Sequence, residues 1–528
     1  MIHFRSTIFA SILFVVVCLP LAHGQNTREK EPVPQSSQGR SGAKPADNPE
    51  VRSLLNDSEA LPAEFASDVS LTLVENGLVR NPALKAKIIT RAFEKASAAQ
   101  DDVMQLPFGA SVEETSAGLH AIASSVTRLN RISLQARVVQ QVVATDPRRA
   151  RQLFESMQRP QLMPVSCNEN WYFLPDAYYD ALAAVLQRGF SEREIAGGNR
   201  AGYLSSIVTE TQFHVQLVPV ARLLSAGDFT EPELRTIVPM YAATLAEVHG
   251  DPLSFNILMS APDRFFEAIN LLLTLLDRRN VDSRAVLQAL RDYMLLNFKG
   301  PKCGATASSN DPESPLPTPI AQFNQTFQSR LVRANLGVIQ EDEIKSDAKD
   351  GSSNDPPLSR WNSLTYFQLL RSIQKLNTPL IEEELAKGRA EHDAQLLSDL
   401  QDLLTRLSSW SNEGEPEVDF FHQKALLLEV LAKRTIGTSL QAEVLDTFVR
   451  FLEQNSYQDV SPIDWFFFAE LLLDRDATPN SSTADLKRLV DSREPVLSVY
   501  ARLQLLLQSA KQTPAGKHPT KGPNKAAS

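Results

Sequence analysis

Apolar residues recur at helical spacing along most of this chain, and this pattern limits the possible folds more than any other feature. Leu84, Ile88 and Ala92 are spaced so that they share one face of an α-helix, and Leu134, Val138 and Val142 repeat that spacing. Strand-like alternation is rare, and glycine contributes only 21 of 528 residues, which favours long helices over sheets. We therefore predict an all-α fold.

Helix start signals occur at several points along this pattern. Asn81-Pro82, Asp146-Pro147 and Ser461-Pro462 each place a capping side chain before a proline, which is favoured in a first helical turn. Helices of this length joined by short loops pack as antiparallel neighbours. The sequence thus predicts α-solenoid-like stacked helical hairpins, similar to tetratricopeptide or HEAT arrays but without a strict repeat signature.

Two further features bear on this stack. The segment 84–89 resembles 134–139, and an offset of about 50 residues fits either a true repeat of hairpins or two unrelated amphipathic helices. Pro219 lies within an apolar stretch that predicts a helix over 205–225. Because proline removes a helical hydrogen bond, we expect it to kink or break that helix.

The N-terminus resembles a secretory signal. Residues 7–21 are apolar, and Ala22-His23-Gly24 places small residues at the −3 and −1 positions of a cleavage site. We predict a signal peptide over 1–24 with cleavage before Gln25; the alternative is an uncleaved N-terminal anchor. No later run is long and apolar enough to span a bilayer, so we expect an extracytoplasmic protein, periplasmic or secreted, with no transmembrane span after cleavage.

Composition divides the remaining chain. The stretches that lack apolar anchors predict disorder or linkers, and the stretches with helical spacing predict domains. The expected divisions are a disordered spacer at 25–50, a solenoid-like domain at 51–300, a linker with one docked helix at 301–357, a second helical domain at 358–510, and a disordered basic tail at 511–528.

Cys167 and Cys303 are the only cysteines left after leader removal. An oxidising compartment favours a disulfide between them, and we predict that bond. The alternative is two free, buried thiols. A disulfide requires the two Cα atoms to lie close together, and the sequence does not give that distance.

An aromatic stretch follows Cys167. Trp171, Tyr172, Tyr178 and Tyr179 form either a surface for a partner or a structural filling between helical layers. A second aromatic run, at 465–468, places bulky apolar residues in succession and is expected in the core.

Motifs of known chemistry are missing. There is no HExxH, CxxC or GxSxG, and the glycines at 197–202 lack phosphate-binding spacing and follow no predicted strand. We predict no catalytic, cofactor-binding or metal-ligating residues. One enzymatic alternative is glycan cleavage, in which Glu155-Ser156 would supply the acid, although no glycine-led motif follows that pair.

The net charge of −10 disfavours nucleic acid as a partner, because phosphate binding needs clustered cations. The expected function is an exported, non-catalytic helical scaffold that binds protein or peptide in a groove between stacked helices. Two alternatives remain open. One is a cell-envelope protein that binds a surface through its lysine-containing tail, and the other is an enzyme whose site is assembled from distant residues.

Overall fold

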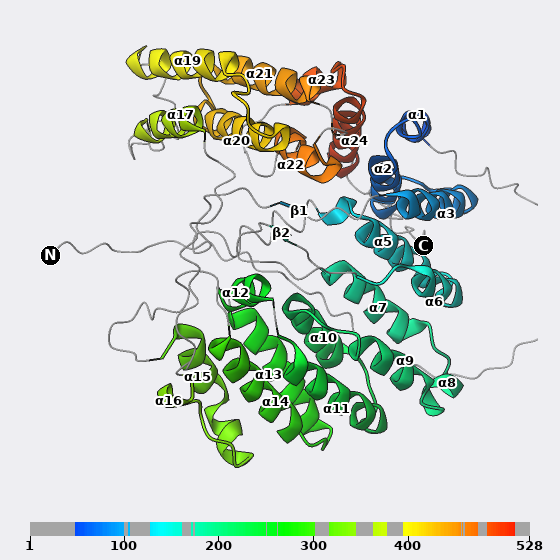
Figure 1. Cartoon of the computed structure of the whole chain (residues 1–528). Coiled ribbons are helices and arrows are strands. Elements are labelled where there is room, and N and C mark those ends of the chain that lie inside the picture. Colours follow the sequence, from blue (N-terminus) through cyan, green and yellow to red (C-terminus); the bar gives the residue numbers. More distant parts are fainter. Residues whose placement is uncertain are drawn as a thin grey trace, which may run out of the picture. The chain divides into compact units, whose positions relative to one another are not determined.

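The described part of the chain is all-α (Figure 1). The computed structural model describes residues 48–99, 104–105, 127–160, 171–172, 175–249, 251–260, 262–300, 316–344, 363–376, 394–455, 457, 460–473 and 483–512. Within these ranges, the one sheet is a two-residue antiparallel ladder in which β1 (Met104–Gln105) pairs Met104 with Tyr172 of β2 (Trp171–Tyr172). The predicted all-α class is therefore confirmed.

Several predictions fall outside the described residues. The leader, Cys167, Cys303 and the proposed disulfide lie there, as do nearly all of the 25–50 spacer and the 511–528 tail. Contacts group Pro45–Ser528 as one unit. The expected division of this part into domains at 51–300 and 358–510 stays a prediction. No described helix has the length and hydropathy needed to cross a membrane.

The first group of helices begins where the capping residues indicated. Asn81 accepts hydrogen bonds from the backbone of Ala83 and Leu84, and Asp146 accepts one from Arg149, which confirms both start signals. The elements of this group are α1 (Pro49–Ser58), α2 (Ala63–Glu75), α3 (Pro82–Ala98), the 3-10 turn η1 (Thr127–Leu129), α5 (Arg131–Val143) and α6 (Pro147–Ser156).

The echo between 84–89 and 134–139 relates α3 to α5. Gln135 donates to Ser97 and Arg131 donates to the carbonyl of Ala99, so the two helices run antiparallel and pack on each other. Equivalent helices of successive hairpins run parallel. The echo therefore reflects two amphipathic helices that face one another, and it does not mark equivalent positions of a repeat.

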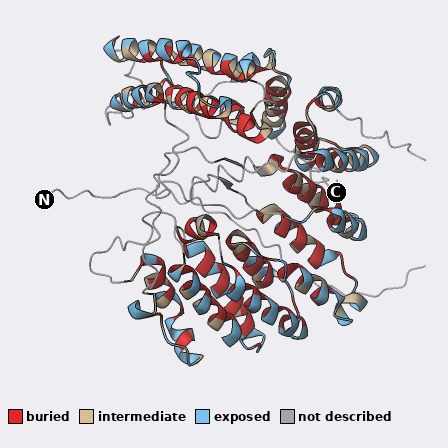
Figure 2. Ribbon diagram, viewed as in Figure 1, coloured by how far each residue is buried: buried red, intermediate tan, exposed pale blue. Residues whose placement is uncertain are grey.

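The middle of the chain stacks helices in parallel register. The elements are α7 (Asp176–Arg188), α8 (Glu192–Ala196), α9 (Asn199–Val208), α10 (His214–Ala226), α11 (Glu231–Glu247), α12 (Pro252–Ser260), α13 (Pro262–Arg278), α14 (Arg284–Lys299), α15 (Thr318–Arg333) and α16 (Glu341–Ile344). Helix α10 packs on α13, and α11 packs on both α9 and α14. Buried residues follow the faces by which neighbouring helices meet (Figure 2).

Hydrogen bonds fix this register and show that its spacing varies. Side-chain hydrogen bonds join α9 to α11 at two points, from Arg200 to Glu233 and from Thr244 to the Val208 carbonyl, at separations of 33 and 36 residues. Between α11 and α14, the bond from Asn297 to the Val248 carbonyl spans 49 residues. A stack whose step changes in length explains the lack of a strict repeat signature.

Pro219 does not break a helix, so one of the two outcomes expected from the sequence is wrong, and a kink at this residue stays a prediction. The chain breaks earlier, between Val208, the last residue of α9, and His214, the first of α10, and Pro219 lies inside α10. Gln216 promotes the restart, because its side chain accepts from the backbone N–H groups of Gln212 and Phe213.

The last group of helices returns to the first. Its members are α17 (Leu364–Lys375), α19 (Ala394–Ser409), α20 (Glu417–Arg434), α21 (Gln441–Gln454), α22 (Pro462–Leu473), α23 (Thr483–Val490) and α24 (Pro495–Gln512). Residues 465–468 are all buried, as expected of core aromatics. Helix α24 packs on α22 and α23 and also on α1 and α2, so the last described helix contacts the first two.

Candidate functional site

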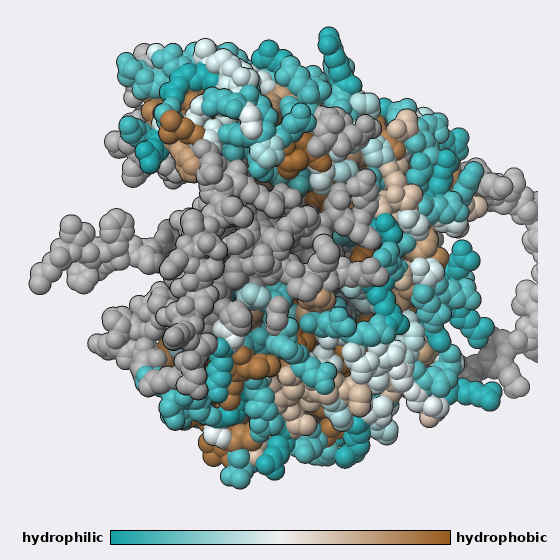
Figure 3. Space-filling view, in the orientation of Figure 1, coloured by the Kyte–Doolittle hydropathy of each residue, from teal (hydrophilic) through white to brown (hydrophobic). Residues whose placement is uncertain are grey.

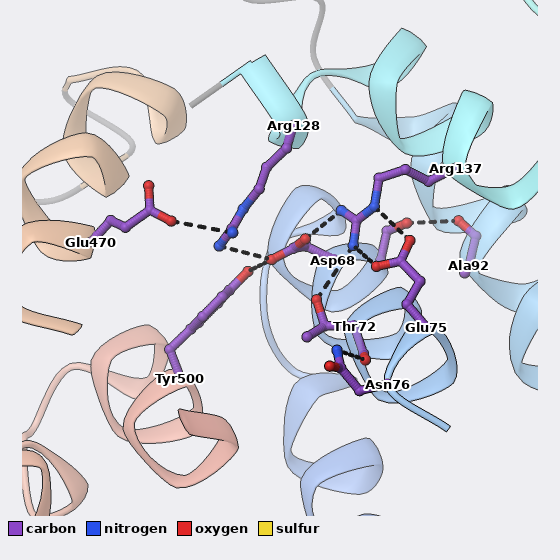
Figure 4. Close-up of polar contacts among 10 residues, drawn as sticks. Asp68, Thr72, Glu75, Asn76, Ala92, Arg128, Arg137, Glu470 and Tyr500 are labelled. Atoms are coloured by element: carbon purple, nitrogen blue, oxygen red, sulfur yellow. Dashed lines mark hydrogen bonds and ion pairs between the residues drawn. The ribbon is translucent and has the colours of Figure 1, made fainter. Parts of the chain in front are cut away.

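A buried cluster of charged side chains joins α2 and α5 to α22 and α24 (Figure 4). We call it the Asp68 cluster, and it consists of Asp68, Glu75, Arg128, Arg137, Glu470 and Tyr500. It is the largest concentration of ion pairs around a fully buried acid in the described residues, and so it is the first place to look for chemistry.

Both oxygens of Asp68 have partners. Its exposed fraction is 0%, Arg137 Nη1 donates to Oδ1 at 2.5 Å, and Tyr500 Oη donates to Oδ2 at 2.6 Å. Arg128 Nη2 lies 3.5 Å from the same Oδ2. The carboxylate is therefore held by two guanidinium groups and a phenol, which is the pairing that a buried charge requires.

The two arginines reach further acids. Arg137 binds Glu75 in a bidentate manner, with Nε–Oε1 and Nη2–Oε2 distances of 2.9 and 2.8 Å. Arg128 lies 3.2 Å from Glu470 and places its guanidinium carbon 5.5 Å from the centroid of the Phe466 ring. The cluster thus continues from the first helices to α22.

Protonation in this cluster is fixed near neutral pH. Burial alone would raise the pKa of Asp68, but the charges of Arg128 and Arg137 and the hydrogen bond from Tyr500 together hold that pKa below its usual value. Burial raises the pKa of Tyr500 well above its usual value. An ionised acid beside a neutral phenol, each engaged with the other, is suited to holding helices together.

Aromatic rings pack around Tyr500, whose hydroxyl binds the Asp68 carboxylate. The Tyr500 ring lies 6.2 Å from that of Phe65 at 87° and 4.7 Å from that of Phe466. Edge-to-face contacts of this kind add to the apolar packing around the ion pairs. Low local polarity strengthens those pairs and makes the loss of any one partner costly.

A second polar pair lies in the middle of the chain. His214, at the start of α10, is 0% exposed, and its Nδ1 lies 2.7 Å from Tyr293 Oη on α14. Burial lowers the pKa of His214 to about 3, so the ring is neutral at ordinary pH. Its Nε2 is buried and has no hydrogen-bond partner among the residues that the structure describes. A neutral imidazole with one bond is typical of a core histidine.

The start of α20 buries a third polar group. Lys424 donates to the carbonyl of Trp410 at 2.6 Å and lies 5.6 Å from the Phe420 ring centroid. Burial lowers the pKa of His422 to about 4. Gln423 is fully buried, and within the described ranges neither its Oε1 nor its Nε2 makes a hydrogen bond. The three side chains Lys424, His422 and Gln423 come from one helix, α20.

The aromatic residues singled out from the sequence separate into two sets. Tyr178 and Tyr179 are each 3% exposed, and the Tyr178 ring lies 4.9 Å from that of Phe154, so both belong to the core. Trp171 and Tyr172 form β2, and their side chains lie outside the described residues. Of the pair considered for glycan cleavage, Glu155 is exposed and binds Arg151 at 2.9 Å.

Sequence inspection missed the Asp68 cluster, although one signal was present. Phe65, Asp68, Val69 and Thr72 share one helix face, so Asp68 interrupts an apolar stripe. A charge on such a stripe predicts a buried partner. It does not identify Tyr500, which is 432 residues away.

Ligand sites are not evident in the described residues. No group of three or more His, Cys, Asp or Glu side chains there could hold a metal ion. The hollow beside α3 is open to solvent and is lined by five exposed residues of that one helix, among them Lys87, Arg91 and Glu94. No family model, curated protein or solved structure matches this chain.

Proposed function

We propose that this chain is an exported, non-catalytic helical scaffold that binds a protein or peptide partner in a groove between stacked helices. The observation that carries the proposal is the parallel register of α9, α11 and α14, which the bonds from Arg200, Thr244 and Asn297 fix. Stacked helical hairpins present extended surfaces, and proteins built this way use those surfaces for binding. The support for this proposal is an analogy of fold.

The buried ion pairs support a rigid frame. Arg200 binds Glu233 in a bidentate manner at 2.8 and 2.6 Å and also donates to the Asp228 carbonyl, so one side chain fixes α9 against the start of α11. The Asp68 cluster does the same for α2, α5 and α24. A preorganised frame loses less entropy when a partner binds.

Export is the second part of the proposal. It is supported by the apolar run at 7–21 and by the small residues Ala22 and Gly24. The test is fractionation of cells that express the full chain, followed by N-terminal sequencing. Recovery from the extracytoplasmic fraction with Gln25 first supports export, and recovery only from the cytoplasm overturns it.

The binding part is tested by covalent cross-linking and affinity capture with the full chain in that fraction. A protein partner recovered at constant stoichiometry, and competed by the unlabelled chain, supports the scaffold. Turnover of glycan by the purified chain would favour an enzyme. Binding to isolated envelope that disappears when 511–528 are removed would favour a surface-binding protein.

A further inference from the structure

Helix α17 exposes two large apolar side chains next to each other. Leu364 is 69% exposed and Phe367 is 42% exposed, and they lie one turn apart. Other large hydrophobic residues that are exposed in the described ranges occur one to a helix: Met240 on α11, Leu271 on α13, Leu296 on α14 and Val332 on α15. Single exposed apolar residues are normal at a protein surface, whereas an adjacent pair on one face calls for an explanation.

The same face continues with two cations. Gln368, Arg371 and Lys375 are exposed and follow Leu364 at steps of four, three and four residues, which places them on one line along the helix. Arg371 and Lys375 form no ion pair or hydrogen bond within the described structure. We call the five residues Leu364, Phe367, Gln368, Arg371 and Lys375 the α17 strip. It is about 17 Å long at the rise of an α-helix.

The opposite face of α17 is anchored. Tyr366, Leu369 and Ile373 are buried, and the helix packs on α19 and α20. The Tyr366 ring lies 5.3 Å from that of Phe367 at 68°, so a buried side chain supports an exposed one. Figure 3 shows apolar atoms at the surface over α17. The strip is therefore held in place by core packing while its own side chains face outward.

Charge indicates what the strip would bind. The chain carries a net charge of −10, yet the strip contains two cations and no acid. Glu413 accepts from Thr365 at 3.0 Å, which places a negative charge beside the apolar end of the strip and leaves the other end positive. A second copy fits poorly, because parallel pairing opposes like charges and antiparallel pairing sets Lys375 against Leu364.

We propose that the α17 strip binds an acidic amphipathic segment of the partner, with apolar side chains on Leu364 and Phe367 and carboxylates at Arg371 and Lys375. This proposal rests on the scaffold function and specifies the chemistry of its partner. Apolar anchors supply most of the affinity in such helix-on-helix contacts, and the charges set orientation and selectivity.

The test uses the purified full-length mature chain and two fluorescein-labelled peptides of about 15 residues. Both peptides present Leu and Phe at helical spacing; one carries Glu on its flanks and the other carries Lys at the same positions. Fluorescence anisotropy is measured at about 50 mM and about 300 mM NaCl. We expect the Glu peptide to bind at least about 10-fold more tightly than the Lys peptide, with the difference shrinking at the higher salt.

Variants identify the surface. Arg371→Glu with Lys375→Glu should weaken the Glu peptide by about 10-fold or more and improve the Lys peptide, whereas Phe367→Ala should weaken both. The matched control is Arg264→Glu with Arg278→Glu, which makes the same charge change at exposed positions of α13 and should leave the preference intact. Circular dichroism confirms that each variant is folded.

Three results would overturn the proposal: equal binding of the two peptides or binding of neither, a preference that survives charge reversal on α17, or a concentration-dependent dimer that Phe367→Ala abolishes. The scaffold function is judged separately. If the α17 charge-reversed chain still captures its protein partner, the strip is excluded and the scaffold stands.

Discussion

The Asp68 cluster and the His214–Tyr293 pair bury polar groups in opposite ways. Asp68 is ionised and is held by Arg137, Tyr500 and Arg128. His214 is neutral, and its one hydrogen bond in the described part of the chain is to Tyr293. Both side chains are 0% exposed, so the difference lies in their partners and not in burial.

The comparison shows what each arrangement requires. A buried carboxylate must be paired or it becomes protonated, and its partners can come from anywhere in the chain. A buried histidine escapes that cost by losing its proton, and one hydrogen-bond partner then suffices. The charged cluster therefore links distant helices, whereas the neutral pair joins two helices of one stack and makes it sensitive to acid.

The sharpest way to break this comparison is Asp68→Ala. Arg137 and Arg128 would lose their shared buried acceptor, and we expect the free energy of unfolding to fall by about 3–5 kcal/mol. Urea unfolding followed by circular dichroism measures it. Asp57→Ala is the matched control, because Asp57 also pairs with α24, through Arg502, but at an exposed edge. If Asp68→Ala lowers the free energy of unfolding no more than Asp57→Ala does, the Asp68 cluster does not hold α24 to the first helices more strongly than the exposed pair does.

A smaller effect is expected for Tyr500→Phe. The ring and its contacts with Phe65 and Phe466 remain, while the hydrogen bond to Asp68 Oδ2 is lost. Hydrogen bonds to charged groups contribute about 1.5–3 kcal/mol, and we expect a loss in that range by the same urea measurement. Addition of Tyr500→Phe to Asp68→Ala should then cost little more, since both remove one interaction. If the two losses of unfolding free energy added in full, the hydrogen bond between Asp68 and Tyr500 would not be the interaction that both substitutions remove.

The pH dependence tests the other half of the comparison. The folded pKa of His214 is about 3, against an ordinary value of 6.5. Between these values the unfolded chain binds a proton that the folded chain does not, so stability falls as pH drops from 6.5 towards 3. From pH 7 to pH 5 this group alone should remove about 2 kcal/mol.

His214→Asn removes that contribution. The drop in unfolding free energy between pH 7 and pH 5 should be about 2 kcal/mol smaller in the variant than in the natural chain, as measured by urea unfolding at each pH. His422→Asn tests the second buried histidine, whose folded pKa is about 4, and should shift the slope in the same direction. If the unfolding free energy of His214→Asn depended on pH as in the natural chain, the His214 ring would be protonated readily in the folded chain.

Much of this fold could be predicted from local signals. Asn81, Asp146 and Ser461 mark helix starts because capping depends on neighbouring backbone groups, and the structure uses all three. The expected break at Pro219 is wrong, because tertiary packing around this buried residue retains a helix that loses one backbone hydrogen bond. The Asp68 cluster could not be derived, because the partner of Asp68 on α24 is set by how distant helices meet.

The smallest predicted effect lies at the edge of the same helix contact. Two residues after Tyr500, Arg502 binds Asp57 at 2.5 Å and Ser53 at 2.9 Å, with side chains of Arg502 and Asp57 that are 25% and 45% exposed. Water screens this pair, and holding two flexible side chains together costs entropy, so a double-mutant cycle of Arg502→Ala and Asp57→Ala should give a coupling of about 0–1 kcal/mol. It should shrink further in about 1 M NaCl, where the screening length is about 3 Å. A coupling as large as that between Asp68 and Tyr500 would mean that the edge, and not the buried carboxylate, secures α24 to the first helices.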